Sequence, residues 1–199
     1  MSIFSKLHAV LRIAIQGTNI PAGKVARVTA CELMRPEGMR RYLVALPSQT
    51  TIEKRALVII LHGSGASAAQ VLGMAFPASP LSVRLEIGER EQVVIMAPNG
   101  NQGAMARAWN DSYAEITSNP KTDDVGLISA LIDKAITENA VDPARVYLMG
   151  VSKGGIMAYR AATCGSPKTP LSALIIANTS DPSEILETCF CQPDRCAVR

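Results

Sequence analysis

The sequence has 199 residues and an apolar fraction of 48%, enough to fill the core of one domain. Its 20 basic and 17 acidic side chains are scattered rather than gathered in runs, and the net charge of +3 gives no reason to expect nucleic acid or an anionic membrane as a partner. No apolar stretch approaches the roughly 20 residues that span a bilayer, so no membrane span is expected.

Residues 1–39 are expected to form an N-terminal extension, and residues 40–199 one domain. The apolar stretch at residues 7–15 has the length of a signal-peptide core, but His8 and Arg12 interrupt it and a poor cleavage region follows. We therefore expect a cytoplasmic protein whose chain begins with a short amphipathic helix.

The rest of the chain contains several apolar runs of strand length. Strands are expected at residues 40–47, 56–61, 93–98, 145–149 and 171–177. All but the first are continuously apolar, as is typical of parallel strands that are buried on both faces. The first ends at a proline.

Helical segments lie between these strands. One begins at the capping residues 122–124 and has apolar residues at spacings of three and four, which form one buried face. Another follows the turn at residues 150–155 and runs to about Cys164. Alternating strands and helices predict an α/β fold, with a mostly parallel sheet and helices on both faces.

The pentapeptide Gly-Val-Ser-Lys-Gly at residues 150–154 fits the pattern G-x-S-x-G. The pattern alone is common, but here it follows a predicted buried strand and opens a predicted helix, which is the context of a nucleophile elbow. Its glycines leave room where the backbone comes too close for a Cβ atom. Ser152 is therefore the candidate nucleophile, and the alternative is an ordinary turn in which Ser152 caps the helix.

The segment His-Gly-Ser-Gly at residues 62–65 follows an earlier buried strand and is the candidate oxyanion turn. Acyl transfer needs two N–H donors aimed at the developing oxyanion. In hydrolases of this architecture one donor follows the nucleophile, here Lys153, and the other lies in the turn after an earlier strand, here Gly63 or Ser64. His62 is expected to shape this turn through its own hydrogen bonds, and a role as general base is the alternative.

The same turn also fits a dinucleotide-binding fingerprint, because Gly63, Gly65 and Ala68 have the spacing G-x-G-x-x-A. That fingerprint needs an acidic residue at the end of the next strand, about 20 residues on. The next predicted strand ends farther away, in Asn99, and Glu86 precedes it. A dinucleotide-binding oxidoreductase is therefore disfavoured, and no cofactor is expected.

A long loop in the middle of the chain holds the one tryptophan of the sequence, Trp109, beside Asn110. This loop is expected to border the cleft, where the indole could line an acyl or aromatic pocket; anchoring of the loop by packing is an equal alternative. The carboxylates of Asp123 and Asp124 are attributed to helix capping rather than to catalysis. The Lys153 side chain is expected in solvent.

Five cysteines are an odd number, and Cys189, Cys191 and Cys196 crowd the last part of the chain. Three thiols with no histidine near them do not complete a four-ligand zinc site, so no metal is expected. A disulfide between Cys164 and Cys189 would suit an exported protein and conflicts with the expected cytoplasmic location. Free thiols are the simplest interpretation.

Seven short segments of the sequence, taken in their order along the chain, form one combined pattern. They are Arg-Tyr-Leu at 41–43, Leu-His-Gly-Ser-Gly at 61–65, Ala-Pro-Asn-Gly at 97–100, Trp-Asn at 109–110, Asp-Asp-Val-Gly at 123–126, Val-Asp-Pro-Ala-Arg-Val-Tyr at 141–147 and Gly-Val-Ser-Lys-Gly-Gly-Ile-Met-Ala-Tyr at 150–159. Together they resemble the polyhydroxybutyrate depolymerase and feruloyl esterase group of α/β-hydrolases. The resemblance covers residues 40–178. It implies hydrolysis of a small or polymeric carboxylic ester through an acyl-serine, without metal or cofactor, and frequent export, the alternative to a cytoplasmic location.

The resemblance implies a triad in the order Ser, Asp, His, but both histidines of this sequence, His8 and His62, precede Ser152. Asp181 is the candidate acid, although its strand lies only one helix after the elbow, earlier than the resemblance implies. We therefore expect a chain truncated at its C-terminus, without the last strands and triad partners, and weakly active or inactive as an esterase. A non-catalytic binding module on the same fold is the rival hypothesis.

Overall fold

The computed structural model describes residues 26–49, 53–78, 85–110, 119–164 and 171–176. Six strands form one sheet in the order β1-β2-β4-β3-β7-β8, and two short strands form a second sheet. The large sheet consists of β1 (Arg27–Arg35), β2 (Gly38–Leu46), β3 (Arg55–Leu61), β4 (Val94–Pro98), β7 (Val141–Val151) and β8 (Leu171–Ile176). The small sheet pairs β5 (Asn101–Gln102) with β6 (Arg107–Ala108).

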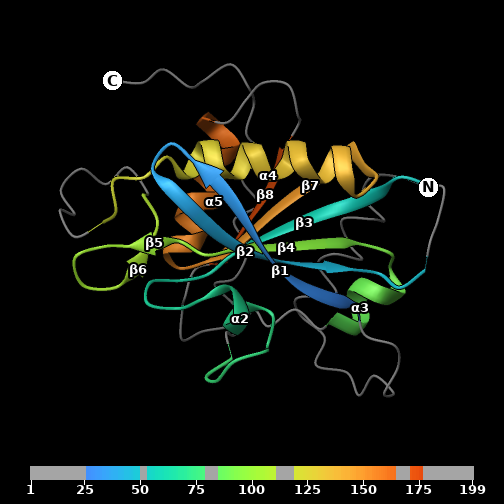
Figure 1. The fold of residues 1–199 in the computed structure, drawn as a ribbon, viewed down its shortest axis with the longest axis horizontal. Helices are drawn as coiled ribbons and strands as arrows, with labels where there is room; N and C mark the ends of the chain where they lie inside the picture. Colours follow the sequence, from blue (N-terminus) through green and yellow to red (C-terminus); the bar gives the residue numbers. More distant parts are fainter. Residues whose placement is uncertain (1–25, 50–52, 79–84, 111–118, 165–170, 177–199) are drawn as a thin grey trace.

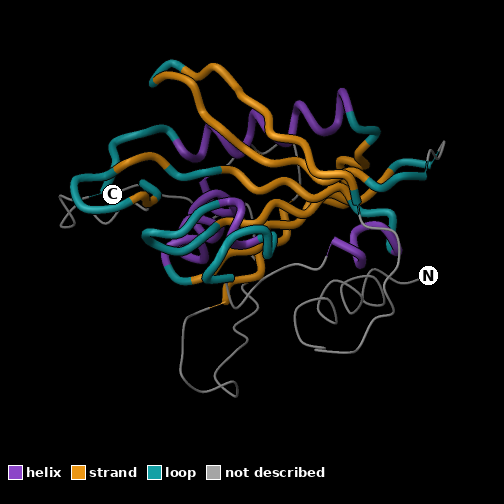
Figure 2. The backbone as a smooth tube through the Cα atoms, turned by 60° about the horizontal axis from the view of Figure 1, so that its bottom comes forward, coloured by secondary structure: helices purple, strands orange, loops and turns teal. Residues whose placement is uncertain are grey.

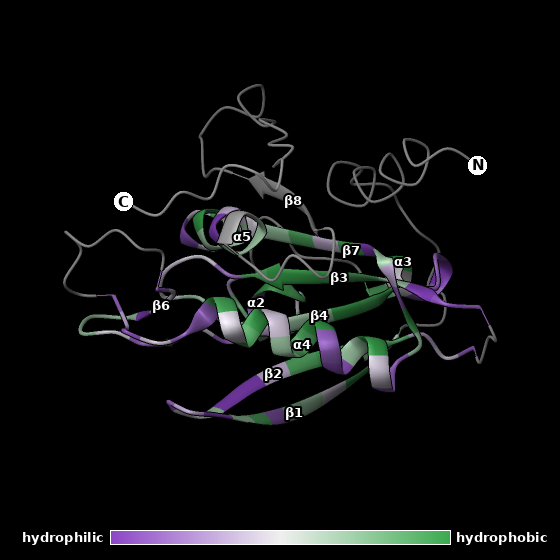
Figure 3. Cartoon of the chain, turned by 90° about the horizontal axis from the view of Figure 1, so that it is seen from above, coloured by the Kyte–Doolittle hydropathy of each residue, from purple (hydrophilic) through white to green (hydrophobic). Residues whose placement is uncertain are grey.

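The strands β4, β3, β7 and β8 are neighbours, and each adjacent pair is parallel. This confirms the parallel arrangement predicted from the apolar runs. β3 from Leu57 to Leu61 and all of β4 are buried, because layers of the protein cover both faces of these strands. In Figure 3, β3 and β4 are hydrophobic along their length, whereas β1 and β2 carry hydrophilic stretches.

Helices cover both faces of the sheet, as predicted (Figure 1). They are α2 (Ala68–Val71), α3 (Leu85–Arg90), α4 (Asp124–Glu138) and α5 (Lys153–Cys164). Side chains alternate between the two faces along a strand. Leu57, Ile59 and Leu61 of β3 therefore pack with α4 and α5, while Val58 and Ile60 pack with α2 and the start of α3. Figure 2 shows the strands crossing the molecule as one twisted layer.

Residues 27–39 lie inside the expected N-terminal extension, yet the structure includes them in the sheet. β1 pairs antiparallel with β2, from Arg27 opposite Leu46 to Arg35 opposite Gly38. Gly38 has a φ of 121°, a conformation that favours glycine and closes the tight turn of this hairpin. The sheet thus begins before the expected boundary at residue 40.

α4 begins where the sequence predicted, with Asp123 as its N-cap. One carboxylate oxygen of Asp123 accepts a hydrogen bond from the Gly126 N–H at 2.9 Å, which satisfies a donor of the first helical turn. In the described ranges, no helix is both long enough and apolar enough to cross a bilayer.

Candidate active site

Ser152 lies at the tight turn between β7 and α5. Its φ of 52° is in the left-handed region, which few residues other than glycine adopt, and the residue is exposed. α5 begins at Lys153, and the N–H groups of Gly155 and Ile156 donate to the Ser152 carbonyl at 2.8 and 3.2 Å. An exposed serine on a strained turn from strand to helix has the geometry of a nucleophile elbow.

Close backbone contacts explain two glycines of the pentapeptide. A Cβ atom on Gly154 would overlap the Leu61 carbonyl oxygen and lie 2.6 Å from the His62 carbonyl oxygen. A Cβ atom on Gly150 would overlap the Gly154 carbonyl and lie 2.5 Å from the Gly155 nitrogen. Because these positions lack side chains, the backbone of α5 can lie directly against the ends of both β3 and β7. The elbow is thereby brought to the turn that follows β3.

The turn at residues 62–65 contacts the elbow. β3 and β7 are adjacent and parallel, with Leu61 opposite Gly150, so both turns leave the same edge of the sheet. A Cβ atom on Gly63 would lie only 3.6 Å from the Cβ atom of Ser152. The turn expected to hold the nucleophile and the turn expected to hold the oxyanion therefore lie side by side.

His62 is fully buried at the end of β3, and both of its ring nitrogens make hydrogen bonds. Nδ1 is 2.7 Å from the Gly63 carbonyl oxygen, and Nε2 accepts from the Gly100 N–H at 2.9 Å. These partners require a neutral ring with its proton on Nδ1. The ring thus joins the turn after β3 to the turn after β4. A role as base toward Ser152 would require one of these bonds to break.

The surroundings of His62 keep it neutral. Burial lowers the pKa of His62 from 6.5 to about 4; the hydrogen bond to Gly63 opposes this shift, and the positive charge of Arg107 adds to it. The imidazole is therefore uncharged at neutral pH, as its acceptor role toward Gly100 requires.

Stability is expected to fall in acid because of His62. Between pH 6.5 and about 4 the unfolded chain takes up a proton at this position and the folded chain does not, so stability is lost as the pH falls through this window. The loss reaches about 3 kcal/mol at about 1.4 kcal/mol per pH unit. Urea unfolding at pH 7 and pH 4.5 measures it. The His62→Gln variant should show a smaller difference between the two pH values; an equal difference would contradict this role.

Trp109 is fully buried against His62. Its indole N–H donates to the His62 carbonyl oxygen at 2.7 Å, and the two ring centroids are 4.9 Å apart. Asn110 is also engaged: its N–H donates to Asp124 at 2.7 Å and its side-chain amide to the Thr122 carbonyl at 2.9 Å. Of the two roles that the sequence left open for Trp109, these contacts favour anchoring of the loop.

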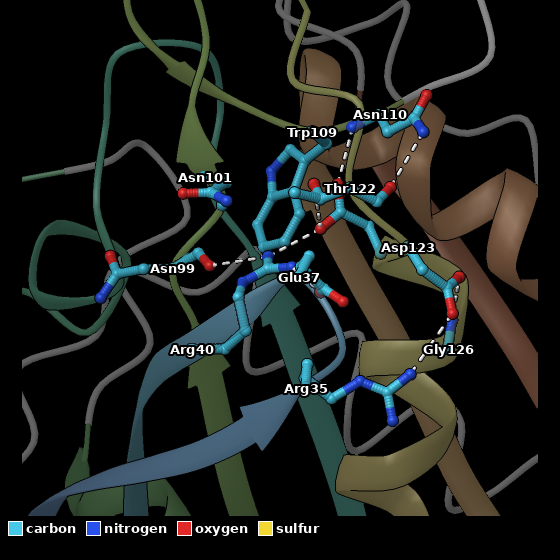
Figure 4. Close-up of polar contacts among 12 residues, drawn as sticks. Arg35, Glu37, Arg40, Asn99, Asn101, Trp109, Asn110, Thr122, Asp123 and Gly126 are labelled. Carbon is cyan, nitrogen blue, oxygen red and sulfur yellow. Dashed lines mark hydrogen bonds and ion pairs between the residues drawn. The ribbon is translucent and has the colours of Figure 1, made fainter.

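Arg40 and Asp124 form a buried ion pair. Figure 4 shows Arg40 near Glu37, Asn99 and Trp109 among the polar contacts of this region. Arg40 Nη2 lies 2.6 Å from Asp124 Oδ1, and the side chains are 3% and 0% exposed. Arg40 also donates to Glu37 at 2.9 Å and to the Asn99 carbonyl at 3.3 Å. The other oxygen of Asp124 accepts from Asn110. This pair therefore ties β2 and the turn after β4 to the loop of Trp109 and the start of α4.

Two expectations for side chains near the site need correction. Asp124 was attributed to helix capping together with Asp123, but only Asp123 caps α4, while Asp124 is the buried partner of Arg40. The Lys153 side chain was expected in solvent, but it is half-buried and donates to the side-chain oxygen of Asn119. Neither Arg40 nor Asn119 was a candidate from the sequence, because nothing local to them indicates a distant partner.

Several candidates lie outside the described residues. These are Asp181, His8 and the cysteines at positions 189, 191 and 196. Cys31, on β1, is a half-buried free thiol. Within the described ranges, no group of three histidine, cysteine or acidic side chains is arranged to hold a metal ion.

Sequence comparisons find esterases. A family model described as phospholipase/carboxylesterase matches residues 48–185. "Putative esterase NocK" of Nocardia uniformis subsp. tsuyamanensis is 32% identical over 143 residues, which are 69% of this chain and 38% of that protein. A poly(3-hydroxybutyrate) depolymerase of Ralstonia pickettii is 30% identical over 124 residues, which are 58% of this chain and 24% of that protein. The chain thus spans well under half the length of these two relatives.

The fold is also found in solved structures. A ferulic acid esterase from Anaeromyces mucronatus, solved in complex with ferulic acid, matches with a TM-score of 0.54. The match covers 74% of this chain and 56% of the esterase at 15% identity. At this identity the likeness establishes the α/β-hydrolase fold and nothing finer.

Proposed function

This chain belongs to the phospholipase/carboxylesterase family of α/β-hydrolases, and on that premise we propose that it is a serine carboxylester hydrolase acting through an acyl intermediate on Ser152. The observation that carries the proposal is the elbow itself. Ser152 is exposed, has a φ of 52°, and lies against a second glycine-containing turn at the carboxyl edge of a parallel sheet. A capping serine needs neither the strained backbone nor the second turn.

In the proposed reaction, the Ser152 hydroxyl attacks the ester carbonyl and the alcohol leaves, which gives an acyl-serine that water then hydrolyses. The N–H groups of Lys153 and of Gly63 or Ser64 hold the oxyanion of the tetrahedral intermediate. The start of α5 adds a partial positive charge at this point. His62 serves here as a positioning residue, because its ring and carbonyl fix the oxyanion turn against Gly100 and Trp109.

The proposal assigns no base within this chain. Both histidines precede Ser152, and His62 already uses both ring nitrogens. Asp181 remains the candidate acid. The 199-residue polypeptide is accordingly proposed to be a weakly active or inactive form. The rival, a binding module on the same fold, rests on the same lack of a histidine after Ser152.

The substrate class is proposed from the relatives. One is named a poly(3-hydroxybutyrate) depolymerase, and a structural neighbour holds ferulic acid. The first name refers to a polymeric ester and the second protein is named an esterase, so we propose a carboxylic ester of small or polymeric form as the substrate.

Hydrolysis of p-nitrophenyl butyrate by the purified, folded chain tests the proposal. We expect little turnover, because removing triad members typically costs ~10⁴–10⁶ in rate. Ser152→Ala and His62→Ala are the comparison variants, and circular dichroism establishes that each is folded. Robust turnover abolished by both substitutions would overturn the expectation and show that the reaction needs His62, as base or as positioning residue. Robust turnover lost only in Ser152→Ala would mean that another group in the chain acts as base.

A further inference from the structure

An open pocket of about 210 Å³ lies beside the oxyanion turn, at the carboxyl end of β4. Its polar lining comes from Arg40, Arg41, Asn99, Asn101, Gln102 and Arg107. All the lining residues belong to the described part of the chain, and none of them is acidic. The pocket therefore offers guanidinium and amide groups without a competing carboxylate in its wall.

The three arginines of the pocket differ in their partners. Arg40 is buried and held by Glu37 and Asp124. Arg41 pairs with Glu32 at the surface, at 3.1 Å. Arg107 has no side-chain hydrogen bond or ion pair to another residue in the described ranges, yet its charge is close enough to lower the pKa of His62. Arg107 is thus the guanidinium with its donors available to a ligand.

The pocket and Ser152 lie on the same edge of the sheet. The backbone carbonyl of Arg107 accepts a hydrogen bond from the Gly65 N–H at 2.8 Å, which fixes Arg107 against the oxyanion turn. β4 and β7 are separated by β3 alone. With strands about 4.8 Å apart, the end of β4 is about 10 Å from the end of β7.

From this arrangement we propose that the pocket binds a carboxylate at the far end of the ester substrate, with Arg107 as its principal partner. The inference rests on the proposed esterase function and narrows its substrate class to esters that carry a carboxylate remote from the scissile carbonyl, on the scale of the roughly 10 Å between the ends of β4 and β7. A guanidinium matches a carboxylate with two parallel hydrogen bonds, and the amides of Asn101 and Gln102 lie in the same wall.

A binding experiment tests this proposal without requiring that the chain hydrolyse the ester. Monomethyl suberate carries an ester at one end and a carboxylate at the other, and dimethyl suberate is its neutral match. Isothermal titration calorimetry of the full chain is expected to show tighter binding of the monoester. Arg107→Ala should weaken monoester binding about 10-fold or more, because charge-assisted hydrogen bonds are lost. Arg107→Lys should restore part of the affinity.

Arg90→Ala is the matched control, because Arg90 is a surface arginine of α3 paired with Glu91 and lies away from the pocket. It should leave the affinity unchanged. Equal binding of the monoester and the diester, or an Arg107→Ala variant with unchanged affinity, would overturn the inference. If Ser152 proves unreactive while the carboxylate preference depends on Arg107, the esterase proposal fails and the pocket stands. If instead Ser152 is reactive and the carboxylate preference does not depend on Arg107, the proposed role of the pocket fails and the esterase proposal stands.

Discussion

Replacing Asp124 with alanine is expected to destabilise the fold by about 3–5 kcal/mol. The carboxylate is 0% exposed and its removal leaves the guanidinium of Arg40, itself 3% exposed, without its closest partner. The Asn110 N–H also loses its acceptor. Removing one charge of a buried ion pair costs far more than the net contribution of the intact pair, which is why one truncation has so large an effect.

The neighbouring carboxylate provides the control. Asp123 is exposed and caps α4, so Asp123→Ala should cost about 1 kcal/mol, the usual effect of losing an N-cap. The free energies of unfolding from urea titrations, followed by circular dichroism, give both values. A double variant, Arg40→Met with Asp124→Leu, should recover part of the loss because neither of the two most buried charges remains, although Glu37 then loses its arginine partner. Equal losses in the two single variants would contradict the role given to the ion pair.

The central strands could be predicted because a strand that is buried on both faces has a continuous run of apolar residues in its sequence. Six of the seven residues of β3, from Ala56 to Leu61, are apolar, and a run of this length is easily recognised in a sequence. β1 could not be predicted in this way. Every residue of β1, from Arg27 to Arg35, is exposed or half-buried, so the strand contains no apolar run. Only its pairing with β2 in the structure shows that it is a strand.

The same distinction holds for the candidate site, where local patterns could be predicted and contacts between residues distant in sequence could not. The glycine pattern around Ser152 is local, and its strand–turn–helix context follows from neighbouring residues. The contacts of Asp124 and Trp109 are not local. Asp124 contacts Arg40, which is 84 residues away in the sequence, and Trp109 contacts His62, which is 47 residues away. A single sequence with scattered charges contains no signal that pairs such residues, so these roles required the structure.

The most direct test of Ser152 as the nucleophile is its selective modification in the folded chain. A fluorophosphonate reacts irreversibly with activated serine hydroxyls, so even a slow reaction accumulates product. After incubation and proteolysis, mass spectrometry locates the label. Label is expected on Ser152 in the folded chain, because the strained turn exposes this residue beside the glycine-containing turn at residues 62–65.

Three comparisons complete this measurement. Label should be absent from Ser152 when the chain is unfolded in urea and absent at position 152 in the Ser152→Ala variant. It should appear faster with added imidazole, which can act as an external base. Preferential labelling of Ser152 in the folded state is the predicted result. Labelling spread evenly over the serines, or equal at Ser152 in folded and unfolded chains, would contradict the assignment of this turn as a catalytic elbow.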